Sequence, residues 1–132
     1  MAEPIYHHRT ERFSNLFVET SEKLKYLFQT KNDVFILTSS GTGAMEAAVM
    51  NTIAPGDKVI TVNGGKFGER WGKLCRIAGA DVDEIILDWG KSIDPALIEE
   101  KLNADKSIKA VFLQYSETST GAVHDVKAVG EV

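Results

Sequence analysis

Short, continuous apolar runs alternate along this chain with segments whose apolar residues recur every three or four positions. The apolar runs cover residues 34–37, 58–62, 85–87 and 108–115. Helical spacing characterises residues 10–29, 45–53, 67–78 and 95–102, and a last helix is expected to start near Asp125. Fully buried strands that alternate with helices are typical of a parallel sheet covered on both faces. The sequence therefore predicts an α/β fold, a three-layer α-β-α arrangement with a mostly parallel sheet.

Capping residues mark where several of these helices begin and end. Thr10 is a suitable N-cap for the first helix. Asp94 and Pro95 give a later helix an N-cap followed by proline at its first position. Gly79 is expected to stop the helix before it, because glycine adopts the left-handed conformation that ends many helices.

The composition limits the class of protein. The 132 residues are 43% hydrophobic and 26% charged, which suits one soluble globular domain or part of one. The net charge is −4 and the basic residues are scattered, so we expect neither nucleic acid nor a membrane surface as a partner. No apolar run approaches the roughly 18 residues of a membrane span. The single cysteine, Cys75, excludes an internal disulfide and fits a reducing compartment, so we expect a cytoplasmic protein.

A small-residue turn follows the first apolar run. Residues 39–44 read Ser-Ser-Gly-Thr-Gly-Ala and open a helix. A helix that begins in this way directs backbone N–H groups and the positive end of its dipole at one spot, which suits a phosphate or carboxylate. Residues 63–68 and 116–121 form two further loops after strands, and both are rich in glycine or hydroxyl groups. Because ligands of such sheets bind beyond the carboxyl ends of the strands, we expect the three loops to meet around one ligand.

Other common sites do not match the sequence. Glu46 stands where the dinucleotide fingerprint needs its third glycine, and Leu74 follows Gly72-Lys73 where a P-loop needs serine or threonine. No histidine and cysteine residues have the spacing of metal ligands, so we predict no metal site. No G-x-S-x-G nucleophile motif is present.

Three motifs, at residues 40–47 (SGTGAMEA), 65–71 (GKFGERW) and 117–121 (ETSTG), resemble those of class V aminotransferases. The chain is most similar to the alanine–glyoxylate and serine–glyoxylate aminotransferase branch, which includes proteins labelled as a soluble hydrogenase subunit. The resemblance implies an enzyme of fold type I that uses pyridoxal 5′-phosphate (PLP). Such an enzyme transfers an amino group from an alanine- or serine-type donor to a 2-oxo acid such as glyoxylate.

The resemblance also implies which residues bind the cofactor. It assigns the PLP phosphate to Thr42, Gly43 and Ala44. Phe67 would stack on the pyridine ring, and Thr118 would hydrogen-bond near the ring hydroxyl. These assignments agree with general chemistry, since a phosphate suits a helix N-terminus and a flat heterocycle suits an aromatic face.

The resemblance covers only the first part of the family's sequence. We expect residues 1–132 to be a single fragment of the cofactor-binding large domain, with the small C-terminal domain absent. The lysine that forms the Schiff base and the aspartate that pairs with the pyridine nitrogen have no counterpart here, so no catalytic residue is assigned. The chain alone is therefore expected to be inactive, and a homodimer or other self-association is expected from the family.

A non-catalytic protein is the alternative. A flavodoxin-like module would bind a phosphorylated ligand or a partner protein and catalyse nothing. In that case the glycine turn is a plain connection or a simple phosphate site, Phe67 packs in the core and Thr118 is an ordinary loop hydroxyl.

Overall fold

The computed structural model describes residues 4–132, and the chain divides into two compact units. The first unit ends at Thr38 and the second runs Ser39–Val132. Among the described residues, no helix is both long and apolar enough to cross a membrane.

The first unit contains one long helix, α1 (Glu11–Leu27). Its predicted N-cap is confirmed, because the Thr10 hydroxyl accepts a hydrogen bond from the Phe13 amide at 3.3 Å. The strand predicted at residues 34–37 is wrong, since this segment has no strand pairing anywhere in residues 4–132. Phe35 within it is 82% exposed. A strand needs a neighbour to take up its backbone hydrogen bonds, and apolar side chains alone do not supply one.

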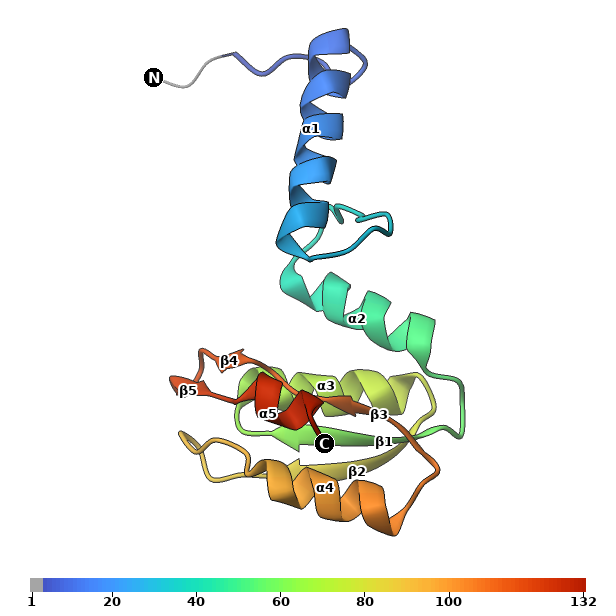
Figure 1. Ribbon diagram of the computed structural model, residues 1–132, viewed down its shortest axis with the longest axis vertical. Coiled ribbons are helices and arrows are strands. Elements are labelled where there is room, and N and C mark those ends of the chain that lie inside the picture. The colour runs from blue at the N-terminus through green and yellow to red at the C-terminus, as the bar shows by residue number, and fades with distance from the viewer. Residues whose placement is uncertain (1–3) are drawn as a thin grey trace. The chain divides into compact units, whose positions relative to one another are not determined.

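The second unit is built on a three-stranded parallel sheet. Its strands are β1 (Lys58–Asn63), β2 (Asp81–Ile86) and β3 (Ile108–Phe112), in the spatial order β2-β1-β3 (Figure 1). β1 is the central strand, and Val59, Ile60, Thr61 and Val62 are all buried within it. The predicted parallel α/β sheet is confirmed.

Helices cover both faces of this sheet. α2 (Gly41–Thr52) and α3 (Lys66–Ile77) pack on the face that carries Val59, while α4 (Pro95–Ala104) and α5 (Val126–Gly130) pack on the face that carries Ile60 and Val62 (Figure 1). The first core contains Val49, Ile53, Val59 and Cys75, and the second contains Ile60, Val62, Ile85, Ile93 and Ile98. Alternate side chains of β1 therefore fill two cores, which gives the three layers that the sequence predicts.

The helix boundaries follow the predicted caps. The Asp94 carboxylate accepts a hydrogen bond from the Ala96 amide at 3.0 Å, and Pro95 is the first residue of α4. Asp125 caps α5 through the Ala128 amide, also at 3.0 Å. Gly79, directly after the cap of α3, has a φ of +84°, a conformation that glycine adopts without strain.

A short hairpin replaces part of the loop predicted after the last strand. β4 (Ser116–Glu117) pairs antiparallel with β5 (Ala122–Val123). β3 ends at Phe112, earlier than the predicted residue 115. The hairpin anchors Glu117 on one side of a tight turn at the carboxyl end of the sheet.

Candidate cofactor-binding site

The three predicted loops meet at the first turn of α3. The Lys66 amide donates to the Ser119 hydroxyl at 3.0 Å, which joins the loop after β1 to the β4–β5 turn. One turn further along α3, Arg70 Nη1 donates to the Thr42 hydroxyl at 2.7 Å, which joins α3 to the start of α2. The loops after β1 and β3 come together because parallel strands present their carboxyl ends at one edge of the sheet, whereas in residues 4–132 the start of α2 follows no strand and joins them through Arg70.

The carboxylate of Glu117 forms the centre of this arrangement. Glu117 is 0% exposed. Its oxygens accept hydrogen bonds from the Phe67 amide at 3.1 and 3.2 Å, from the Gly68 amide at 2.8 Å and from the Ser119 hydroxyl at 2.6 Å. We call Glu117, Ser119 and the amides of residues 66–68 the Glu117 network. It satisfies the first amides of α3, which have no partner within the helix.

Glu117 and His124 are two buried titratable groups whose charges influence each other. Burial alone would raise the pKa of Glu117, but hydrogen bonds from the Ser119 hydroxyl and from the amides of Gly68, Phe67 and Ser119 outweigh burial and lower it. Burial lowers the pKa of His124, and the Glu117 carboxylate opposes that shift only in part. The His124 Nδ1 atom accepts a hydrogen bond from the Ile93 amide at 3.0 Å, so His124 is neutral with its proton on Nε2.

The stability of the second unit is expected to fall as the pH drops below about 6.5. A buried histidine with a lowered pKa stays neutral while the unfolded chain takes up a proton, so its contribution is present above the unfolded pKa and is lost below it. Glu117 adds a loss of the same sign at lower pH, below its ordinary pKa of 4.5. Urea unfolding at pH 7.5, 6.5 and 5.5 measures the slope. In the His124→Gln variant the slope between pH 6.5 and 5.5 should disappear, and an unchanged slope would contradict this assignment.

Arg70 connects two of the residues that the sequence assigns to the cofactor. Besides its hydrogen bond to Thr42, its guanidinium carbon lies 5.0 Å from the centre of the Phe67 ring. Phe67 and Thr42 are both half-buried. A fixed positive charge therefore lies between a hydroxyl and an aromatic ring, next to the start of α2.

The N-terminus of α2 differs from those of the other helices in residues 4–132. Its N-cap, Ser40, makes no side-chain capping hydrogen bond, and no acidic residue occurs in its first turn. Thr10, Asp94 and Asp125 cap their own helices, and Glu117 caps α3. The Ser39 hydroxyl donates a hydrogen bond to the Ser40 carbonyl. The partial positive charge at this end thus has no anionic side chain beside it.

The remaining predicted ligands lie near these groups. Gly43 and Ala44 belong to the first turn of α2, where Ala44 is exposed. Thr118 is exposed and follows Glu117 directly, so the Glu117 network fixes the backbone on either side of it. The loops of all five residues therefore meet around α3, and their individual roles stay predictions.

Sequence reasoning did not assign the residues that organise the site. It left Glu117, Ser119 and His124 without a role. A glutamate among hydroxyl residues carries no local sign that it is buried, because its partners lie 49 and 50 positions away. The sequence shows only that polar residues follow an apolar run at residues 116–121. This pattern indicates a loop, but it does not show what the loop contacts.

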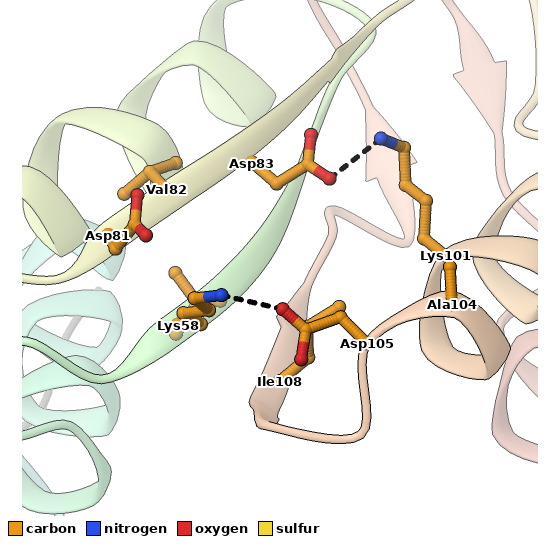
Figure 2. Close-up of a pocket in the computed structure, with 9 residues that line it drawn as sticks. Lys58, Asp81, Val82, Asp83, Lys101, Ala104, Asp105 and Ile108 are labelled. Carbon is orange, nitrogen blue, oxygen red and sulfur yellow. Dashed lines mark hydrogen bonds and ion pairs between the residues drawn. The ribbon is translucent and has the colours of Figure 1, made fainter.

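A cavity lies at the opposite edge of the sheet from the candidate site, where the strands begin (Figure 2). Its volume is about 320 Å³. Figure 2 shows its charges paired, Lys58 with Asp105 and Lys101 with Asp83, each at 2.7 Å. These partly exposed ion pairs connect β1 and β2 to α4 and the residue that follows it. None of the residues assigned to the cofactor lines this cavity. No group of three or more metal-binding side chains occurs among the described residues.

Comparison with known proteins gives a consistent result. The family model "Aminotransferase class-V" matches residues 3–132. The chain is 46% identical over 124 residues to the soluble hydrogenase 42 kDa subunit of Anabaena cylindrica, a match that covers 92% of this chain and 32% of that protein. It is 38% identical over 125 residues to the serine–glyoxylate aminotransferase of Methylorubrum extorquens, covering 92% and 31%.

A solved structure shows the same fold. The aspartate aminotransferase of Thermus thermophilus, described as belonging to subgroup IV, matches with a TM-score of 0.87 and 37% identity. That match covers 98% of this chain and 36% of the solved one. The chain thus spans about a third of the length of the relatives that it matches.

Proposed function

Because this chain belongs to the class V aminotransferase family, a family that depends on PLP, we propose that it is the cofactor-binding part of such an enzyme. The observation that carries the proposal is the position of Arg70. It contacts both Thr42, assigned to the phosphate, and Phe67, assigned to the ring. Residues for the two ends of one cofactor are therefore neighbours.

The residues present fit a phosphate attached to a flat ring. The start of α2, without an acidic residue or a side-chain cap, suits the phosphate, with Thr42, Gly43 and Ala44 around it. The Arg70 guanidinium adds a positive charge and a forked set of donors. Phe67 offers an aromatic face, and Thr118 adds a hydroxyl at the edge of the site. When bound, PLP supplies the electron sink for amino-group transfer, while these residues bind and orient it.

The proposed substrates are an amino acid and a 2-oxo acid. We propose an alanine- or serine-type donor and a glyoxylate-type acceptor, which the name of the serine–glyoxylate aminotransferase supports. The amino donor is less narrowly defined than the acceptor, because one similar solved structure is an aspartate aminotransferase. The two relatives are similar in identity to this chain but differ in donor.

The 132 residues on their own are proposed to bind the cofactor without turnover. The motifs found here hold the phosphate and ring, and none of their residues is assigned to the covalent or proton-transfer steps. An amino-donor assay with glyoxylate measures this directly. Turnover by the purified chain that depends on PLP would overturn the proposal.

A PLP titration of the purified chain tests cofactor binding. Saturable binding, followed by absorbance, should weaken about tenfold in Thr42→Ala and Phe67→Ala, which remove a hydroxyl contact and an aromatic face. Thr52→Ala at the other end of α2 and Phe35→Ala in the first unit are matched controls that should bind as the unaltered chain does.

The other outcomes of the titration are informative. Borohydride reduction followed by mass spectrometry should trap no adduct at one defined lysine, and a single trapped site would show that the nucleophile lies within this sequence. Binding of inorganic phosphate without binding of PLP would favour the non-catalytic phosphate-binding module. Binding equal in all variants would remove the assigned residues from the site.

We also propose that the protein self-associates, as a homodimer in the family's manner, and that it is cytoplasmic. Several large apolar side chains of the first unit are exposed, among them Leu16, Phe17, Tyr26, Phe28 and Phe35. Exposed apolar groups of this number favour association. Light scattering that shows a monodisperse monomer would contradict the self-association.

A further inference from the structure

We propose that Glu117 is a positioning residue, whose carboxylate fixes the first turn of α3 and thereby places Phe67 and Arg70 for the cofactor. This inference rests on the proposed function, since it gives the Glu117 network a purpose at the PLP ring. Glu117 itself is buried behind the helix and has no assigned contact with the cofactor.

The Glu117 network holds backbone atoms directly. The carboxylate accepts from the amides of Phe67 and Gly68, and the Ser119 hydroxyl, which donates to Glu117, accepts from the Lys66 amide. Three successive amides of α3 are therefore held by two residues of the β4–β5 turn. The Phe67 ring extends from a backbone position that this carboxylate contacts.

The two loops approach so closely that little adjustment remains. A Cβ atom added at Gly65 would lie 2.5 Å from the Ser119 Oγ atom and 2.6 Å from the Glu117 Cγ atom. Real Cβ contacts are longer than this, so only glycine allows the observed approach. The backbone just before Phe67 thus lies directly on the two side chains that hold it.

An ionised carboxylate suits this position better than other groups. Each of its two oxygens accepts more than one hydrogen bond, and the negative charge lies at the positive end of α3. A glutamine of the same shape has one such oxygen and would direct an NH₂ group at backbone donors. Charge and geometry therefore both favour glutamate here.

The side chain that caps α3 comes from a distant part of the sequence, unlike the caps of the other helices described here. Thr10, Asp94 and Asp125 are exposed and cap helices that begin at the next residue. Glu117 caps α3 from 49 positions away. A local cap would have satisfied the same amides, whereas a distant one also fixes α3 relative to the turn that carries Thr118.

Arg70 depends on the same turn. It lies one helical turn after Phe67 and contacts both the Phe67 ring and the Thr42 hydroxyl. If the first turn of α3 frays, both the ring and the guanidinium lose their fixed positions relative to α2. Glu117 therefore acts on the cofactor through two other residues.

The test compares Glu117→Gln with the unaltered chain in a PLP titration followed by the circular dichroism that a fixed cofactor ring acquires. We expect about tenfold weaker binding, the equivalent of one hydrogen bond to a charged group, and a reduced dichroic signal. In a Phe67→Ala background the same substitution should change the affinity less than it does in the unaltered chain, because one of the two groups that Glu117 positions, the Phe67 ring, is already gone. Asp125→Asn, which alters a cap away from the site, is the control.

An equal loss of affinity in both backgrounds would assign Glu117 a purely structural role and overturn the inference, as would unchanged affinity in Glu117→Gln. Hydrogen exchange gives a readout without the cofactor. The amides of Phe67 and Gly68 should exchange about tenfold faster in Glu117→Gln, while those of β1 should not change. Unchanged exchange at these two amides would also overturn the inference.

The exchange measurement separates this inference from the proposed function. If the unaltered chain does not bind PLP, the proposed function fails, and exchange at residues 67 and 68 still decides whether Glu117 holds them. If Glu117→Gln does not fold, Ser119→Ala replaces it. That variant removes one donor to the carboxylate and one acceptor for Lys66, and it should show the same coupling to Phe67 at smaller amplitude.

Discussion

Replacing Ile60 with alanine is expected to lower the free energy of unfolding by about 4 kcal/mol, within the range measured for large core side chains. Ile60 is 0% exposed and lies in the central strand β1, between β2 and β3. It belongs to the core with Val62, Ile85 and Ile98, which α4 covers. Neighbours on three sides belong to regular elements, so the cavity left by the substitution cannot close by a small rearrangement.

Urea unfolding followed by circular dichroism measures this loss. Ile60→Val removes one methyl group and should cost only about 1 kcal/mol. Ile86→Ala in the neighbouring strand is the matched control, because Ile86 is 74% exposed and its truncation should have little effect. Equal losses for Ile60→Ala and Ile86→Ala would show that β1 does not form the centre of the core.

The second large effect is expected for Gly68→Ala, at about 2 kcal/mol or more. An added Cβ atom would lie 2.5 Å from the Val62 carbonyl oxygen and 3.0 Å from the Asn63 Cα atom. Both contacts are with the backbone of β1, which cannot rotate away as a side chain can. α3 would have to move off the sheet, and the Gly68 amide would move away from Glu117.

This substitution should therefore reduce both stability and PLP affinity. Unfolding in urea gives the first quantity, and the titration described above gives the second. Gly130→Ala is the control, since a Cβ atom there meets nothing within 4 Å. A Gly68→Ala variant as stable as Gly130→Ala would show that α3 and β1 are farther apart than described here.

The parts of the fold that could be predicted from sequence are those with local causes. Asp94 and Asp125 begin helices through their own side chains, and Gly79 ends one through its own φ angle. The apolar runs of β1 and β3 were recognisable because both faces of the sheet are covered. The run predicted at residues 85–87 marks only the end of β2, which begins at Asp81 and includes the charged residues Asp83 and Glu84. Residues 34–37 show the limit, since an apolar run does not show whether a partner strand exists.

The position of the candidate site could be predicted from the sequence, but the contacts that hold its residues in place could not. The three loops were expected to lie together because the carboxyl ends of parallel strands meet at one edge, and this reason holds for the loops after β1 and β3. Residues 39–44 also lie there, but no strand precedes them in residues 4–132, and their contact is the Arg70–Thr42 hydrogen bond. The contact of Arg70 with Thr42 and the burial of Glu117 depend on the relative placement of segments 28 and 49 positions apart. No local pattern encodes such distances. For the same reason the β4–β5 hairpin, with two residues in each strand, was not distinguished from a loop.

Because Glu117 caps α3 from 49 positions further along the chain, the cap forms late during protein synthesis. β1, α3 and β2 leave the ribosome well before Glu117, since they end by residue 86. The first turn of α3 must therefore wait for its acceptors, with three amides left to water, until the chain has grown past Ser119. β3, the other edge of the sheet, arrives in the same stretch of chain. The Glu117 network therefore forms only after all three strands of the sheet have been synthesised.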